Sequence, residues 1–137
     1  MAKIVAPKFT TIEELKEWIE TVHEKYYIEM KTASELPNAF WESYSSFSNT
    51  SGGWIILGVQ EGNPRNEIKG VTNVSKAQTS LWDQLSNSNK ISFRNVDNAD
   101  VSIHKIDNKD VMIIYVKEAP ENMKPVYVGG KRENTYI

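Results

Sequence analysis

Two charged side chains that lie two residues apart are the first place where this sequence could support chemistry. Glu29 and Lys31 belong to residues 27–31, where apolar and polar residues alternate and predict a strand. Because side chains alternate between the faces of a strand, Glu29 and Lys31 share one face, and Ile28 and Met30 share the other. A carboxylate beside an ammonium can hold a metal ion and stabilise charge that develops on a phosphate. The simpler interpretation is a pair of solvated surface charges.

Glu61 is a further candidate because it follows the most apolar run of the chain. Gly52 and Gly53 allow a sharp turn, and residues 54–59 carry no charge, which predicts a central strand buried on both faces. Ligands of open α/β sheets bind at the carboxyl ends of strands, where Glu61 would lie. The glycine turn could also offer backbone amides to an anion. The alternative is a tight connection followed by a solvated glutamate.

Other side chains narrow the possible chemistry. His23 and His104 are far apart and lack the spacing of metal ligands. The chain has no cysteine, which excludes disulfides, thiolate nucleophiles and zinc–thiolate sites. It also lacks a nucleophile elbow, a phosphate-binding loop and a dinucleotide fingerprint. No cofactor is therefore expected, apart from Mg²⁺ or Mn²⁺ if the glutamates form a metal site.

The charge distribution gives no dense basic cluster. The net charge is −2, and residues 88–137 are slightly basic, whereas residues 1–87 are acidic. A phosphate-binding surface would have to be assembled in three dimensions, because it needs clustered lysine and arginine. The candidates are Lys31, Arg65, Lys69, Lys90, Arg94, Lys124, Lys131 and Arg132. Scattered charges of this kind are also typical of a solubilising surface.

Size and composition favour a single globular domain. The 137 residues are 39% hydrophobic and 25% charged, which suffices for one core. The first ten residues contain no apolar signal region, and no run has transmembrane length. We therefore expect a cytoplasmic protein without a membrane partner.

The first half of the chain predicts two helices around the strand at 27–31. Thr11 and Glu14 form a capping box for a helix whose apolar residues recur at helical spacing as far as residue 26. Asn38 is the expected cap of a second helix that ends at the glycine turn. Its inward-facing residues are Phe40, Trp41, Tyr44, Phe47 and Ser48, which we interpret as core rather than as a base-stacking surface.

The second half predicts one more helix and several strands. Ser75 is the expected cap of a helix in which Ala77, Leu81 and Leu85 recur every four residues. Residues 86–98 predict the end of this helix and an exposed strand with a mobile connection. The remaining predicted strands are 68–71, a hairpin of 101–106 and 111–116 around the turn 107–110, and a short edge strand at 125–128. The expected fold is α+β, with about three helices packed on a single mixed sheet.

The sequence resembles the Schlafen AlbA-like domain family over residues 24–137. The residues that carry the resemblance are 27–31, 36–37, 40–42, 46–50, 52–53, 55–59, 68–71 and 125–127. They match, in order, the family's E-F-K strand, its A-F-A-N-T-x-G-G turn, its I-x-x-G-V-x-D/E strand end, its I-x-G-V strand and its P-V-Y segment. The matching turn residues are Asn49, Thr50, Gly52 and Gly53, and Glu61 stands where many members have Asp.

The resemblance implies two different functions. Many bacterial members are described as DNA-binding N-terminal domains of transcriptional regulators, which favours a nucleic-acid-binding domain, with DNA preferred over RNA. Animal relatives include RNA-cleaving enzymes, whose carboxylates match Glu24, Glu29 and Glu61. Three such glutamates could hold Mg²⁺ or Mn²⁺ beside a phosphate, with Lys31 as the nearby cation. A dimerisation or protein-interaction module remains the third alternative, because it fits the acidic net charge.

The last residues of the sequence bear on the expected domain organisation. Family members continue past the P-V-Y segment into a Y-x-R-x-G segment, whereas this sequence ends at Tyr136 and Ile137. We therefore expect residues 1–137 to be one domain from the N-terminal part of a longer protein.

Overall fold

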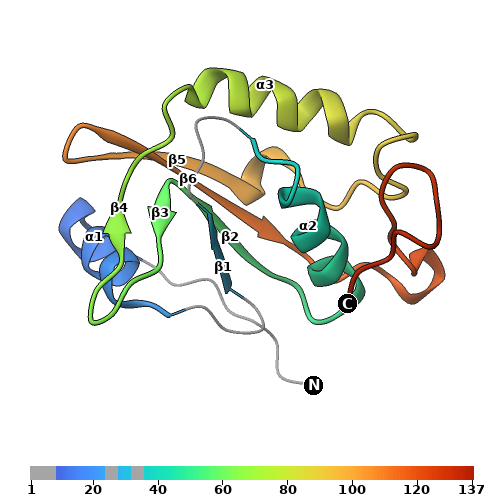
Figure 1. Cartoon of the computed structure of the whole chain (residues 1–137), viewed down its shortest axis with the longest axis horizontal. Helices are drawn as coiled ribbons and strands as arrows, with labels where there is room; N and C mark the ends of the chain where they lie inside the picture. Colours follow the sequence, from blue (N-terminus) through green and yellow to red (C-terminus); the bar gives the residue numbers. More distant parts are fainter. Residues whose placement is uncertain (1–8, 24–27, 32–35) are drawn as a thin grey trace.

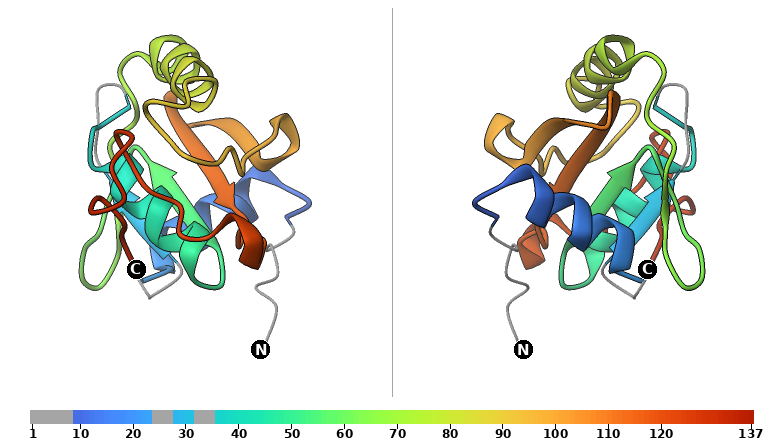
Figure 2. Two further views of the ribbon diagram at one scale, coloured as in Figure 1. Left: turned by 90° about the vertical axis from the view of Figure 1, so that its right-hand side faces the viewer. Right: turned by 90° about the vertical axis from the view of Figure 1, so that its left-hand side faces the viewer.

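A four-stranded mixed sheet forms the centre of the molecule, and helices cover both of its faces (Figures 1 and 2). The computed structural model describes residues 9–23, 28–31 and 36–137. The strand order is β1-β2-β6-β5, with β1 parallel to β2 and the other pairs antiparallel. The strands of this sheet are β1 (Ile28–Lys31), β2 (Gly53–Leu57), β5 (Val101–Ile106) and β6 (Lys109–Val116). The predicted α+β class is confirmed.

The other elements surround this sheet. The helices are α1 (Ile12–Thr21), α2 (Phe40–Asn49) and α3 (Val74–Leu85). A second, two-stranded sheet consists of β3 (Val59–Gln60) and β4 (Glu67–Ile68), and the 3-10 turns are η1 (Asn98–Asp100) and η2 (Glu121–Met123). None of the helices in the described part of the chain has the length and apolar content needed to cross a membrane.

The central strand β2 is buried on both faces, as its uncharged sequence predicts. Ile55 and Leu57 point toward α2 and α3, while Ile56 points toward α1, and all three are fully buried. The strand is shorter than predicted because Gly58 takes a φ of +94°, which turns the chain out of the sheet. A Cβ at this position would lie 3.0 Å from the carbonyl oxygen of Asp110, so only glycine fits. Val59 then begins the small second sheet.

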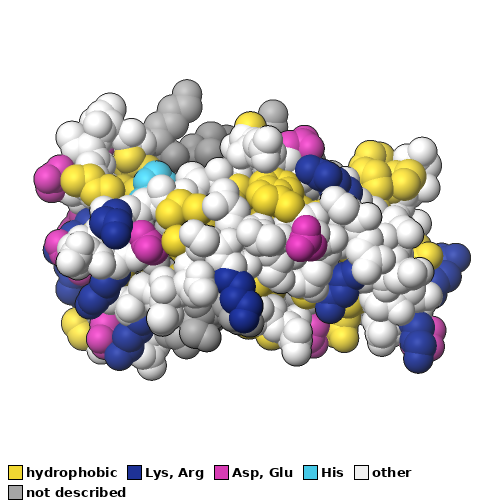
Figure 3. All heavy atoms as spheres, turned by 90° about the horizontal axis from the view of Figure 1, so that it is seen from above, with side chains coloured by type: hydrophobic (Ala, Val, Ile, Leu, Met, Phe, Trp, Pro, Cys, Tyr) yellow, Lys and Arg dark blue, Asp and Glu magenta, His cyan; other side chains and the backbone are white. Residues whose placement is uncertain are grey.

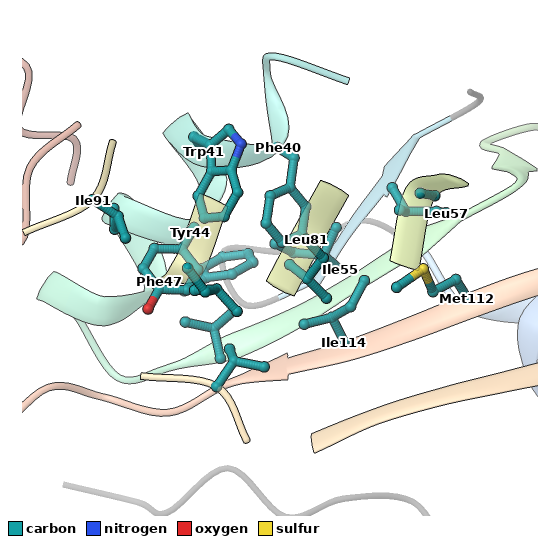
Figure 4. Close-up of a cluster of buried hydrophobic side chains, with 14 of the residues drawn as sticks. Phe40, Trp41, Tyr44, Phe47, Ile55, Leu57, Leu81, Ile91, Met112 and Ile114 are labelled. Carbon is teal, nitrogen blue, oxygen red and sulfur yellow. The ribbon is translucent and has the colours of Figure 1, made fainter. Parts of the chain in front are cut away.

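The aromatic residues of α2 form the larger core with β2, β6 and α3, as predicted (Figure 4). Phe40 and Trp41 meet edge to face, with their ring centroids 4.8 Å apart. Tyr44 is fully buried, and its hydroxyl group donates a hydrogen bond to the Phe93 carbonyl at 2.8 Å. Burial raises the pKa of Tyr44 far above its usual value, which keeps the hydroxyl group neutral.

The start of α1 follows the predicted capping box only in part. Thr11 is the N-cap, and its hydroxyl group accepts a hydrogen bond from the Glu14 amide at 3.2 Å. The Glu14 carboxylate binds the amide and hydroxyl groups of Thr10 rather than the amide of Thr11. The helix ends at Thr21, and residue 26 lies outside the described residues.

The predicted caps of the other two helices are wrong. The N-cap of α2 is Ala39, without a capping side chain, so Asn38 lies one residue too early. The N-cap of α3 is Asn73, whose side chain accepts a hydrogen bond from the Lys76 amide at 3.1 Å. Ser75 therefore lies inside the first turn. Asparagine and serine are equally good caps, so residue type alone does not decide between them.

The hairpin of β5 and β6 confirms the most local of the strand predictions. Its turn consists of Asp107 and Asn108, with φ values of 49° and 68°, as a two-residue type I′ turn requires. The loop is therefore tighter than predicted, and β6 begins at Lys109.

The segments at 86–98 and 125–128 differ from the prediction. Ile91, Asn95 and Val96 are buried, and residues 91–98 form no exposed strand. The predicted edge strand at 125–128 is also absent, because these residues make only isolated bridges, from Val128 to Ile91 and from Tyr127 to Thr135. The two segments instead lie side by side as irregular backbone, with the Ser92 amide donating to the Tyr127 carbonyl at 3.1 Å.

Candidate nucleic-acid interface and carboxylate site

Glu29 and Lys31 lie on the same face of the edge strand β1, as alternation predicts. Their register partners on β2 are Ile55 and Leu57, so both side chains are on the side of the sheet that α2 covers. The Lys31 Nζ atom lies 3.4 Å from Oε1 of Glu29. The lysine side chain is only 16% exposed, against 36% for the glutamate. The lysine charge is therefore largely compensated by its neighbour and partly withdrawn from solvent.

The proposed three-glutamate site is only partly covered by the described residues. Glu61 is exposed and follows β3, which continues from β2 after the Gly58 turn. Glu24 lies outside the described residues. Within the described ranges, no three acidic or histidine side chains are placed to hold one metal ion. A metal site at Glu24, Glu29 and Glu61 therefore stays a prediction.

The two histidines do not meet. His23 is exposed just after α1, and His104 lies on β5. The His104 Nε2 atom lies 3.0 Å from the Ser102 hydroxyl oxygen, and partial burial lowers the pKa of the imidazole. No zinc site is built from these two residues.

Asn49 of the turn motif is a structural bracket between α2 and the C-terminal segment. Its amide nitrogen donates to the carbonyl oxygens of Val126 at 2.9 Å and Tyr136 at 3.0 Å. Its Oδ1 atom accepts a hydrogen bond from the Val126 amide at 2.7 Å. The neighbouring Ser45 hydroxyl group donates to the Val126 carbonyl and accepts from the Tyr136 amide. The asparagine side chain thus uses both of its donors and its acceptor inside the fold.

The two glycines of the motif are required by close packing. Gly52 has a φ of +85°, and a Cβ there would lie 2.8 Å from the Val116 carbonyl oxygen. A Cβ on Gly53 would lie 2.8 Å from the Phe47 ring. The Gly52 amide donates to the Phe47 carbonyl at 2.9 Å, and the Thr50 hydroxyl group donates to the Ser46 carbonyl at 2.9 Å. These groups close the helix end and join it to β2.

Four of the eight candidate cations are compensated by carboxylates. Arg65 connects the loop before β4 to α1, since its guanidinium group contacts two glutamates of that helix. The four pairings are Lys31 with Glu29, Arg65 with Glu17 and Glu20, Lys69 with Glu67, and Lys124 with Glu118 and Glu121, all within 3.4 Å. Compensated cations release little counterion when they meet a phosphate, so these four contribute weakly to nucleic-acid binding.

The other four candidates, Lys90, Arg94, Lys131 and Arg132, have no carboxylate partner among the described residues, and we call them the open cations. They lie on two segments that the structure joins, because the Gly129 amide donates to the Lys90 carbonyl at 2.8 Å (Figure 1, right). Arg132 lines a small hollow together with residues of both segments. The view onto α3 shows basic side chains in separate patches, with acidic ones among them (Figure 3).

Two of the open cations rest on aromatic rings. The Lys90 Nζ atom is 5.9 Å from the Trp41 ring centroid, and the Arg94 guanidinium carbon is 5.4 Å from that of Trp82. Such contacts hold the charged group in place and leave its outer side available to solvent or to an anion.

Comparison with protein families settles the identity of the fold. The family model described as Schlafen, AlbA_2 matches residues 24–137, most of the chain. The chain belongs to the Schlafen AlbA_2 family. A comparison with curated proteins gives no match.

Two solved structures resemble this Schlafen AlbA_2 domain. One is the N-terminal domain of a protein from Nitrosomonas europaea described as related to the ATP-dependent DNA helicase RecG. It has a TM-score of 0.63 and 23% identity, over 91% of this chain and 84% of that one. The other is the DIP2311 protein from Corynebacterium diphtheriae, with a TM-score of 0.55 and 17% identity, over 88% of this chain and 24% of that one. At these identities the likeness shows the fold alone.

The sequence did not predict an open groove on the α1 side of this Schlafen AlbA_2 domain. The groove encloses about 530 Å³ and is lined by aromatic side chains, among them Trp18, Trp54 and Tyr115. Trp54 and Tyr115 are register partners on neighbouring strands, with ring centroids 4.6 Å apart. The signal available in the sequence was the large aromatic residue at one end of each strand, which alternation places on the face opposite α2.

Proposed function

We propose that this domain binds nucleic acid through its phosphates, as part of a bacterial transcriptional regulator that prefers DNA over RNA. The observation that carries the proposal is the placement of the four open cations on adjoining segments. Membership of the Schlafen AlbA_2 family supports it, and so does the description of one structural relative as a DNA-helicase-related protein.

The arrangement of these cations favours weak binding that contacts the phosphates of the nucleic acid rather than its bases. Trp41 is only 1% exposed, so its ring supports Lys90 and cannot stack on a base. Four cations that meet four phosphates would give a log–log salt slope of roughly −3.6 on duplex DNA. Acidic side chains interspersed on the same surface lower the affinity further.

Replacing the open cations with glutamine should abolish binding, because it removes the charges that displace counterions. The variant carries Lys90→Gln, Arg94→Gln, Lys131→Gln and Arg132→Gln. We expect its affinity for a fluorescein-labelled duplex to fall by at least about 100-fold at low salt, with a nearly flat salt dependence. The measurement is fluorescence anisotropy over a salt series, repeated with single-stranded DNA and RNA.

The matched control removes the same number of charges from ion-paired cations. It carries Lys16→Gln, Arg65→Gln, Lys69→Gln and Lys105→Gln, whose partners are aspartates or glutamates. This control should keep most of the affinity and the steep salt slope. Equal loss in both variants would show that only net charge matters, and a parent protein that binds no nucleic acid would remove the proposed function.

Metal-dependent cleavage of RNA is the second candidate, favoured by the shared face of Glu29 and Lys31 on a rigid strand. If the domain cleaves RNA with Mg²⁺ or Mn²⁺, Glu29→Gln should lower the rate by about 100-fold or more, because outer-shell partners alone contribute about 10- to 100-fold and Glu29 would be a direct ligand. Glu67→Gln removes an exposed, ion-paired carboxylate and serves as the control. Equal rates in the two variants would leave Glu29 as an ordinary surface glutamate.

A further inference from the structure

The sheet face opposite α2 is covered over only part of its length. A helix of ten residues such as α1 is about 15 Å long, whereas the eight-residue strand β6 is about 27 Å long. Leu15 and Ile19 belong to the core cluster that covers the end of the sheet where Met30, Ile56 and Val111 lie. The other end is the open groove, whose lining includes Phe9, Trp18, Trp54, Ser102, His104 and Tyr115.

This groove has the size and the character of a site for apolar side chains. Its volume of about 530 Å³ is within the range of ordinary binding pockets, and its lining combines four aromatic rings with aliphatic and polar side chains. The Phe9 and Trp18 rings form one wall, with centroids 5.5 Å apart, and the Trp54–Tyr115 pair forms another. Exposed apolar hollows of this kind in small soluble domains mark interaction sites.

A free strand edge runs along the same groove. β5 is the last strand of the sheet, and both views in Figure 2 place it at the rim, next to the first turn of α1. In the two-residue turn, Ile106 and Lys109 are the hydrogen-bonded pair. Alternation therefore directs the backbone amide and carbonyl groups of Val101, Ile103 and Lys105 outward. The Val101 amide donates to the Asn98 carbonyl, whereas the outward groups of Ile103 and Lys105 have no hydrogen-bond partner among the described residues.

The charge around the groove selects the partner. Glu13 and Glu14 lie in the first turn of α1, and Asp97 and Asp100 lie beside β5, where Lys117 pairs with both aspartates. Lys16 and Lys105 also lie near this edge, paired with Asp107 and Asp110, so six carboxylates and three ammonium groups surround the groove and β5. A nucleic-acid strand would be repelled, and a second copy of the chain would bring the same carboxylates to the interface. A basic segment would be attracted.

We propose that β5 and the open groove bind an extended, basic segment of a partner protein as an added strand. The outward groups of β5 supply the main-chain hydrogen bonds, and alternate side chains of the added strand enter the groove beside Ser102 and His104. The groove and Trp41, whose ring supports Lys90, lie on opposite faces of the sheet. The proposed site therefore does not depend on nucleic-acid binding.

The probe is a fluorescein-labelled seven-residue peptide, Lys-Val-Thr-Phe-Thr-Val-Lys, and its charge control has Glu in place of both Lys residues. We expect the basic peptide to bind at least tenfold more tightly than the acidic one in fluorescence anisotropy. Its amide shift changes in ¹⁵N spectra should fall on β5 and on the residues around Trp54. Equal affinity of the two peptides, or shift changes elsewhere, would overturn the proposal.

Ile103→Pro removes one outward amide without breaking a bond between β5 and β6, because proline is tolerated on the free side of an edge strand. It should lower peptide affinity at least tenfold, whereas Ile103→Val, which keeps the amide, should bind like the parent. Ser102→Phe tests the groove independently, since an exposed serine can accept a ring that fills the hollow; it should also weaken binding. Parent-like binding by Ile103→Pro and Ser102→Phe would overturn the proposal.

Two other possible occupants of the groove would give different experimental results. A parent protein that sediments as a dimer, and as a monomer after Ile103→Pro, would assign the edge to a second copy. A full chain that fails to bind the peptide and binds it once residues 1–8 are removed would assign the groove to the chain's own N-terminal residues. Either result overturns the partner proposal, and neither affects the salt-dependence test of the open cations.

Discussion

Ile56→Asp should leave the chain unfolded. Ile56 is fully buried in β2, between Met30 of β1 and Ile113 of β6, and faces the core under α1. An unpaired carboxylate in such a place costs several kcal/mol, while the total stability of a domain is about 5 to 15 kcal/mol. The residue also lies at the centre of the sheet, so no local rearrangement can bring the carboxylate to water.

The measurement is circular dichroism with thermal or urea denaturation. Ile12→Asp is the matched control, because it makes the same chemical change at a residue that is 44% exposed. Ile12 is the first residue of α1, where an acidic side chain interacts favourably with the helix dipole. The control should therefore melt cooperatively near the parent temperature. A cooperatively melting Ile56→Asp protein would contradict the burial of β2 on both faces.

The central strand, the hairpin and the aromatic core could be predicted because their signals are local. An uncharged run after two glycines strongly favours a buried strand, and alternation on both sides of residues 107–110 predicts a hairpin, although its turn is tighter than predicted. The end of β2 could not be predicted. The chain turns out of the sheet at Gly58, where the backbone of Asp110 packs too closely for a side chain, and Asp110 is 52 residues later in the chain. A glycine within an apolar run carries no sign of such a neighbour.

The irregular segments could not be predicted because distant residues hold them. Residues 91–98 look polar enough for an exposed strand, yet the Tyr44 hydroxyl group bonds the backbone of Phe93 and Asn95. Val126 is buried because Asn49 and Ser45 of α2 bind its backbone. Once side chains satisfy these backbone groups, the segments need no sheet partner.

The electrostatics of the candidate site were equally hidden. Arg65 lies 48 residues from its partner Glu17, so the sequence shows a free cation where the structure shows an ion pair. Arg94 and Arg132, by contrast, have no carboxylate beside them in the described structure. Lys31 and Glu29 are the exception, because two residues in one strand share a face. Strand alternation predicts that pairing, whereas contacts between distant elements require the fold.

Asn49 offers the strongest test of how the family's turn motif acts. Its side chain makes three hydrogen bonds to the backbone of Val126 and Tyr136, at distances from 2.7 to 3.0 Å. If Asn49 acted in ligand binding, its substitution would leave the stability of the domain nearly unchanged. If it acts as a structural bracket, its substitution should destabilise the C-terminal segment.

Asn49→Ala should lower the free energy of unfolding by about 3 kcal/mol, because each lost hydrogen bond to a buried backbone group costs about 1 kcal/mol. The melting temperature should fall by roughly 10 °C. Hydrogen exchange should accelerate at the Val126 amide, which loses its acceptor, and at the Tyr136 amide nearby, while the β5–β6 amides stay protected. Asn98→Ala, at an exposed asparagine whose side chain makes no such bonds in the described structure, should leave both quantities unchanged. Parent-like stability of Asn49→Ala would mean that the bracket is dispensable and would return Asn49 to the candidates for ligand binding.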